Sequence, residues 1–215
     1  MKLAVIALVV VAVALSLAVY SRLPATVPIH WNAAGQINNY VSRAVGAFLL
    51  PGIMLILGGV FAALAEISPS GFDIERKSRP YTAIVTAVLL FLLGLHVYIL
   101  LAALNMARSI ATFVPILLGA LFIVIGNYLP KMRRNFFVGI RTPWTLADED
   151  VWFRTHRLGG ILFVMCGALL MAAGPFFRGR AMEALLITTL IVVAVVTVVY
   201  SFAIYRRPRD KEEMS

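Results

Sequence analysis

The sequence of 215 residues contains little of the chemistry that soluble enzymes use. It has one cysteine, Cys166, so an intramolecular disulfide is excluded, and no Cys/His spacing suggests a zinc site. Because Cys166 lies in an apolar run, we interpret it as a small buried hydrophobic residue. Charged residues make up only 13% of the chain and hydrophobic residues 61%, whereas soluble domains are about a quarter charged and about half apolar. These shortages exclude a large soluble core and indicate a membrane protein with several spans.

Catalytic signatures are also absent from the sequence. It contains no GxSxG, HExxH or Walker motif, and no GxGxxG between a strand and a helix. Of its three histidines, His30 is predicted on the outer side of the membrane, His96 within the bilayer and His156 on the cytoplasmic side, so they cannot share one metal ion. We therefore expect no enzyme activity, no catalytic residue, no metal and no cofactor.

Six apolar runs are long enough to cross the hydrocarbon core of a bilayer, which takes about 20 residues. They lie near residues 3–21, 44–65, 81–104, 110–129, 158–176 and 182–205. The first run follows Lys2 and has small residues at Ser16 and Ala18, as a cleaved signal peptide would. It is longer than the roughly 7–15-residue apolar region of such a signal, so we interpret it as a retained span.

Basic residues are distributed unevenly between the two sides of these spans. With six spans both termini share one side, which holds 14 Lys and Arg against 5 on the other side. Because Lys and Arg in short loops stay in the cytoplasm, the sequence predicts an all-α polytopic protein, N-in and C-in. The expected location is the cytoplasmic membrane of a bacterium or archaeon. The net charge of +9 follows from the same loops, so we expect no direct nucleic-acid binding.

Four regions follow from this topology. Residues 1–66 form an N-terminal membrane domain with an outer loop at 22–43, and residues 67–109 form a connector with the third span. Residues 110–205 form a second membrane domain with a cytoplasmic loop at 130–157. Residues 206–215 form a basic cytoplasmic tail.

The outer loop, residues 22–43, is predicted to be ordered. Its two prolines favour extended backbone, and Asn32–Gly35 and Asn38–Asn39 are typical of turns. Trp31 can anchor the loop at the headgroups. The loop is then either a cap over the helix ends or a surface that contacts a ligand. The candidate ligand contacts are His30, Trp31 and Asn32.

His96 is the only ionisable residue in the six predicted spans that lies away from a span end. Ionisable groups inside a membrane are candidates for function. A neutral histidine can equally bond a hydroxyl or a carbonyl between helices. Because the spans offer no Asp or Glu partner away from their ends, the structural interpretation is favoured, and the functional one stays open.

The cytoplasmic loop, residues 130–157, has the pattern of a shaped element. Gly139 supplies a position for positive φ, and Thr142 before Pro143 should be extended. Thr145 followed by Asp148 matches a capping box in its acidic form, so a helix should begin near Leu146 and continue into the fifth span.

Side chains on that helix are spaced to interact. Asp150 and Arg154 are four residues apart in the favourable order for an ion pair. Trp152, His156 and Gly160 are also spaced by four, so they lie on one helical face. We expect that face to pack or to contact a partner.

The loop also carries a family resemblance. Gly126-Asn127, Pro130-Lys131, Asn135, the run 139–146 (GIRTPWTL), Trp152 and His156-Arg157 resemble the signature of the SdpI family of bacterial membrane proteins. Leu23-Pro24, the run 28–32 (PIHWN) and Gly35 resemble the N-terminal domain that often precedes it.

The resemblance implies a function that the residues alone do not. It implies immunity to a secreted antimicrobial peptide toxin met outside the cell, and recruitment of a cytoplasmic transcriptional repressor to the membrane. The candidate partner residues are then Asn127, Asn135, Arg141, Trp144, Trp152 and His156. The alternative is a small-solute transporter or channel, which needs a polar path through the spans. The candidates for that path are His96, Thr82, Thr86, Asn127, Thr188, Thr189, Thr197 and Ser201.

Overall fold

The computed structural model describes residues 1–32, 34–69 and 78–207. Within them, six helices are long and apolar enough to cross a membrane, which confirms the predicted class. They are α1 (Lys2–Val19), α2 (Arg43–Leu64), α3 (Arg79–Ala103), α4 (Ile110–Tyr128), α6 (Glu149–Ala173) and α7 (Arg180–Tyr205). The charged part of the predicted connector at 70–77 and the tail from 208 lie outside the described residues.

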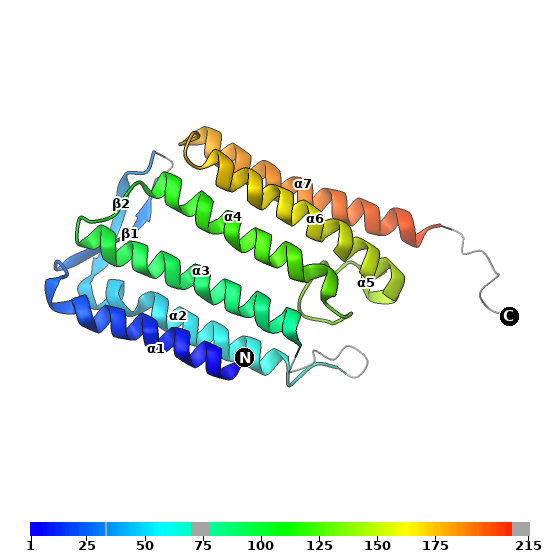
Figure 1. The fold of residues 1–215 in the computed structure, drawn as a ribbon, viewed down its shortest axis with the longest axis horizontal. Coiled ribbons are helices and arrows are strands. Elements are labelled where there is room, and N and C mark those ends of the chain that lie inside the picture. Colours follow the sequence, from blue (N-terminus) through cyan, green and yellow to red (C-terminus); the bar gives the residue numbers. More distant parts are fainter. Residues whose placement is uncertain (33, 70–77, 208–215) are drawn as a thin grey trace.

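The helices form a bundle with two halves (Figure 1). Helices α1, α2 and α3 all pack against one another, α6 packs against both α4 and α7, and α3 and α4 join the halves. The start of α1 and the end of α7 lie at one end of the bundle, as an even number of spans requires. Large apolar side chains such as Ile56 and Val199 are exposed on the helices. An apolar outer surface is what a bilayer solvates, and helices can lie in lipid because most of their backbone polar groups bond one another.

The contact between α4 and α6 is the most extensive between two helices, and glycines form it. A Cβ atom on Gly119 would lie 2.5 Å from the carbonyl oxygen of Gly167, and one on Gly126 would lie 2.6 Å from that of Gly160. The two antiparallel helices therefore touch backbone to backbone. Small residues permit such close approach where lipid replaces water and packing has to drive helix association.

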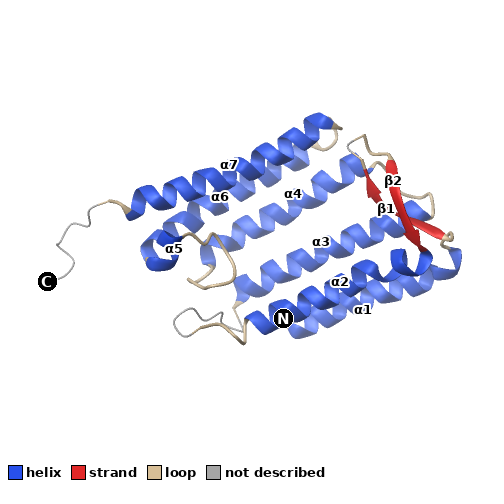
Figure 2. Cartoon of the chain, turned by 180° about the vertical axis from the view of Figure 1, so that it is seen from behind, coloured by secondary structure: helices blue, strands red, loops and turns tan. Residues whose placement is uncertain are grey.

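A β-hairpin covers the end of the bundle opposite the termini (Figure 2). Strand β1 (Thr26–Trp31) pairs antiparallel with β2 (Ile37–Ser42). The turn predicted at Asn32–Gly35 is confirmed, since Gly35 has φ 77° and its N–H donates to the Asn32 carbonyl at 2.8 Å. The second predicted turn, Asn38–Asn39, is wrong, because both residues lie within β2. Strand pairing to β1 overrides the turn preference of Asn.

The hairpin and the cytoplasmic loop offer a test of orientation. Ala34 in the hairpin turn and Ala147 in the loop are both exposed, and the charge distribution predicts that they face opposite sides of the membrane. In a Cys166→Ala background, Ala34→Cys should react with a membrane-impermeant maleimide in intact cells. Ala147→Cys should react only after permeabilisation. Labelling of Ala147→Cys in intact cells would invert the topology.

Candidate functional site

The loop predicted to be cytoplasmic starts where α4 ends, passes through the short helix η2 (Leu129–Lys131) and reaches α5 (Pro143–Ala147). Asn135 organises its first turn. Its Nδ2 donates to the carbonyls of Arg133 (3.0 Å) and Val138 (2.9 Å), and its Oδ1 accepts from the N–H groups of Phe137 (3.0 Å) and Val138 (2.7 Å). The side chain is buried at 1% exposure. The Asn135 side chain thus makes four hydrogen bonds with the loop backbone.

Trp152 and His156 hold the loop against α6. Their rings stack with centroids 3.9 Å apart, and both side chains are completely buried. The indole Nε1 of Trp152 donates to the Met132 carbonyl at 2.9 Å. Gly139 lies against this pair, and a Cβ atom there would collide with Nε2 of His156. Its φ of 121° confirms the predicted positive φ.

The two ring nitrogens of His156 have fixed roles. Nε2 accepts from the Ile140 N–H at 3.0 Å, so this nitrogen carries no proton. Nδ1 lies 2.8 Å from the Trp152 carbonyl, which can only accept, so Nδ1 carries the proton. His156 is therefore a neutral imidazole with an assigned tautomer, and it serves as a brace between the loop and α6.

Short polar contacts attach the loop to α7. The Thr142 hydroxyl lies 3.2 Å from the Ser201 hydroxyl of α7, and within the loop the Thr145 hydroxyl donates to the Ile140 carbonyl at 2.9 Å. The ring of Trp144 packs on Phe202 with centroids 4.9 Å apart. Trp144 therefore contacts α7 and lies apart from the stacked pair on α6.

The predicted start of the helix is wrong in detail. Thr142, in extended backbone as predicted, caps α5 through a capping box with Thr145. Asp148 then caps α6, accepting from the N–H groups of Asp150 (2.9 Å) and Val151 (3.1 Å). The segment offers capping side chains at three positions spaced by three residues, and caps at Thr142 and Asp148 replace the single cap expected at Thr145. The predicted pair of Asp150 and Arg154 is present at 2.9 Å.

The predicted partner residues therefore differ in exposure, and Trp144 is half-buried against Phe202. Asn135, Trp152 and His156 are buried and hold the loop together. Arg141 and Asn127 are exposed; Arg141 donates to the Phe136 carbonyl at 3.0 Å, and Asn127 donates to the Ile123 carbonyl at 2.8 Å. The structure brings Trp152 and His156 together under the loop that Asn135 shapes, and it leaves Arg141 and Asn127 accessible at separate places.

A second candidate site lies at the hairpin end of the bundle. A cavity of about 520 Å³ opens between the hairpin and the ends of the helices. The three residues predicted from the outer loop, His30, Trp31 and Asn32, all line it. The other walls come from α2, α3, α4 and the start of α7, and they are mostly apolar: Leu49, Leu50, Leu95, Tyr98, Ile99, Ile110, Ala111, Val114, Pro115, Met182 and Leu186.

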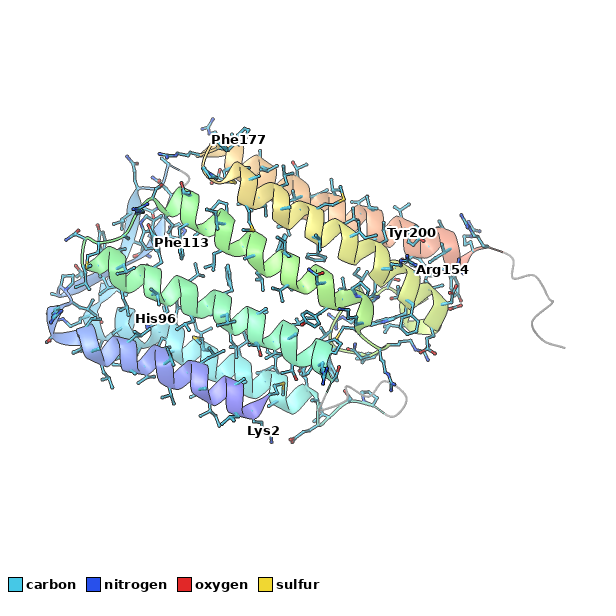
Figure 3. The ribbon with its side chains drawn as sticks, viewed as in Figure 1. Lys2, His96, Phe113, Arg154, Phe177 and Tyr200 are labelled. Carbon is cyan, nitrogen blue, oxygen red and sulfur yellow. The ribbon has the colours of Figure 1, made fainter. Side chains whose placement is uncertain are left out.

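An aromatic cluster links the hairpin to this cavity. Trp31 packs edge-on against Tyr98 of α3, with centroids 5.6 Å apart, and Tyr98 stacks on Phe113 of α4 at 4.9 Å. Figure 3 marks Phe113 beside the hairpin. His30 is turned toward β2, where its Nδ1 lies 2.6 Å from Oδ1 of Asn38. The hairpin is therefore a fixed wall of the cavity, held by aromatic packing.

Sequence reasoning missed Glu183, which also lines the cavity. It lies in the first turn of α7 and is exposed. Among the described residues it is the only Asp or Glu at the hairpin end, where the basic residues are Arg22, Arg43, Arg108, Arg178 and Arg180. That isolation was visible in the sequence, and it could have singled out Glu183.

His96 lies inside the half formed by α1, α2 and α3 (Figure 3). Its Nε2 lies 3.0 Å from the Ser16 hydroxyl and 3.1 Å from the Ala12 carbonyl. Ser16 in turn donates to the Ala47 carbonyl at 2.5 Å. Both side chains are completely buried, so this Ser–His pair ties three helices together and no substrate reaches it. The structural interpretation of His96 is the one that its surroundings support.

The side chains named for a transport path do not form one. Thr189, Thr197 and Ser201 bond carbonyls of their own helix. Thr82 and Thr86 line a separate crevice of about 760 Å³ near Met1. His96 lies apart from both groups, enclosed by α1 and α2.

Comparison with known proteins identifies two regions of the chain. Residues 131–201 match the model of the SdpI/YfhL protein family, and residues 7–55 match a domain of unknown function, DUF1648. The chain is 28% identical over 193 residues to a Bacillus subtilis (strain 168) protein called Immunity protein SdpI, and the match covers 89% of each chain. No solved structure matches the chain. The family region contains most of the cytoplasmic loop, and the DUF1648 region contains the hairpin.

Proposed function

We propose that this chain, a member of the SdpI/YfhL protein family, is an integral membrane immunity protein that protects its cell from a secreted antimicrobial peptide toxin. The observation that carries the proposal is the match to a protein named for immunity along 89% of both chains. The match includes the hairpin as well as the loop, so it extends to both candidate sites.

The toxin meets the protein at the hairpin-end cavity, which faces outward under the predicted orientation. Its apolar walls suit the apolar side chains of an amphipathic peptide, whose burial contributes about 25 cal/mol per Å². Glu183 at the edge supplies a negative charge for a basic group of the peptide. Trp31 adds an aromatic surface of the kind that dominates peptide interfaces.

A challenge assay tests this function. The chain is expressed in a Bacillus subtilis strain that lacks SdpI and is exposed to the toxin against which SdpI gives immunity. Survival should be restored, and Glu183→Gln should raise the toxin sensitivity about tenfold because one paired charge is lost. Glu149→Gln is the matched control, since it removes one exposed carboxylate at the opposite end of the bundle. Killing of cells that hold normal levels of the protein in the membrane would refute the proposal.

The cytoplasmic loop is where we place a repressor. The buried residues Asn135, Trp152 and His156 fix its shape, and Arg141 and Phe136 remain exposed on it. An aromatic ring beside a guanidinium is a common kind of protein contact. A reporter gene controlled by the repressor, placed in the same challenge strain, separates immunity from repressor recruitment. The Arg141→Ala variant should keep the survival of the cells and lose induction of the reporter.

A further inference from the structure

A groove of about 600 Å³ runs along the outer side of the α4–α6 contact, toward the end of the bundle that carries the termini. Gly126 and Gly160, which touch backbone to backbone, form its floor. Its remaining residues are Asn127, Pro130, Lys131, Phe153, Arg157, Ile161, Val164 and Met165. Of the residues predicted to contact a repressor only Asn127 lies here, and neither the hairpin-end cavity nor the exposed pair Arg141 and Phe136 belongs to this surface.

The groove changes from polar to apolar along its length. Phe153, Arg157, Ile161 and Met165 follow one another every four residues on α6, so they form one row with steps of about 6 Å. The row spans roughly 18 Å, which is close to half of the ~30 Å hydrocarbon core. The groove therefore has the depth of one leaflet, with its polar end at the cytoplasmic headgroups under the predicted orientation.

Two cations stand at the polar end, and no carboxylate lines the described groove. The Nζ of Lys131 lies 5.1 Å from the centre of the Tyr128 ring, which positions the ammonium beside the helix end. Arg157 is exposed one turn into the row. Arg154, on the neighbouring face, is instead paired with Asp150 at 2.9 Å.

We propose that this groove is a binding site for one anionic phospholipid of the cytoplasmic leaflet. The phosphate lies between Lys131 and Arg157, where two cations give charge complementarity. One acyl chain lies over Gly126 and Gly160 and against Ile161 and Met165. The lipid then covers one of the backbone contacts between α4 and α6, and basic pockets between helices on the cytoplasmic side are known to hold such headgroups.

The proposed lipid site also accounts for the position of Asn127. Its side chain lines the groove between the cations and the glycine floor, and its Nδ2 donates to the Ile123 carbonyl at 2.8 Å. The carboxamide thus lies at the level where a lipid glycerol backbone meets the apolar chains. The inference is independent of the toxin, because it concerns the opposite end of the bundle.

Native mass spectrometry of the purified full chain tests the site, with phosphatidylglycerol or phosphatidylcholine added in matched amounts. The wild-type protein should retain one phosphatidylglycerol about tenfold more strongly than phosphatidylcholine. The Lys131→Gln/Arg157→Gln variant should lose this preference. The Arg133→Gln/Arg154→Gln variant loses the same charge at the same end and should keep it. Both pairs are exposed, so folding should survive, and thermal unfolding verifies this.

A second pair of variants tests the acyl part of the groove. Met165→Trp fills the groove and should reduce retention of both lipids, whereas Leu169→Trp, one turn farther along α6 and outside the groove, should not. Equal retention of the two lipids by the wild type would overturn the site, as would an unchanged preference in the Lys131→Gln/Arg157→Gln variant. Displacement of the lipid by inorganic phosphate would reduce the site to a phosphate pocket without an acyl groove and would overturn it too.

Discussion

Gly126→Val should nearly abolish the folded protein in the membrane. A Cβ atom at this position would lie 2.6 Å from the carbonyl oxygen of Gly160, and the nearest side chain is that of Val164 at 2.8 Å. The nearest atom belongs to backbone, so no rotamer change relieves the overlap. Helices α4 and α6 therefore have to separate, and the contact of Gly160 with the backbone of Gly126 is lost as well.

The expected size of this effect comes from overpacking. Extra methyl groups in a packed core cost about 1–3 kcal/mol where side chains can adjust, and here the backbone has to move. Because α4–α6 is the most extensive helix contact, we expect a loss at the upper end of that range or above it. The loss should appear as a lowered unfolding temperature in detergent and as reduced protein in the membrane fraction.

Gly59→Val is the matched control. Gly59 lies in α2, and a Cβ atom there would meet nothing within 4 Å. Both variants place the same β-branched residue inside a helix, so the helix-propensity cost is shared. If Gly126→Val were as stable and as abundant as Gly59→Val, the backbone contact between α4 and α6 would be refuted.

Asn135→Asp should open the cytoplasmic loop while the six helices stay in place. The substitution keeps the size of the side chain but removes both N–H donors. A carboxylate would then face the carbonyls of Arg133 and Val138, which now accept from Nδ2. Each lost hydrogen bond is worth about 0.5–1.5 kcal/mol, and a charge buried beside carbonyl oxygens adds to the loss.

Limited proteolysis of inside-out vesicles measures the opening. Trypsin should cleave the variant at Arg133, Arg134 or Arg141 at least tenfold faster than the wild type. Asn127→Asp makes the same chemical change at an exposed position nearby, and its cleavage rate should stay within about twofold of the wild type. Equal protection of Asn135→Asp and the wild type would show that the side chain does not hold the loop.

Several features of the protein were determined by the sequence alone. The six spans are predictable because each apolar run has to cross the bilayer by its own length, and most observed helix ends lie within two residues of the predicted ends. The turn at Asn32–Gly35, the positive φ of Gly139 and the extended Thr142 are local as well. In these cases the residue and its immediate neighbours fix the backbone, so no distant contact is needed.

The start of α6 shows where local reasoning fails. Thr142, Thr145 and Asp148 can each cap a helix, and their preferences differ by less than the energy of the contacts around them. The bond between Thr142 and Ser201 of α7 and the buried Thr145 belong to the structure with two caps. Likewise, β2 forms because β1 lies beside it, although Asn38 and Asn39 favour a turn when taken alone.

The tertiary structure alone decided which motif residues are accessible. Spacing placed Trp152 and His156 on one face of a helix but did not say that Met132 and Ile140 would cover that face. The sequence drew attention to His96 as an ionisable residue within a span, but it did not identify its partner Ser16, which lies 80 residues away in the sequence. It also did not bring Glu183 to the same cavity as Trp31. The apolar residues of a span are distributed almost evenly around the helix, so the sequence does not indicate which face packs against a neighbour. Small residues and a few polar groups decide this, and each of them acts only together with a partner on another helix.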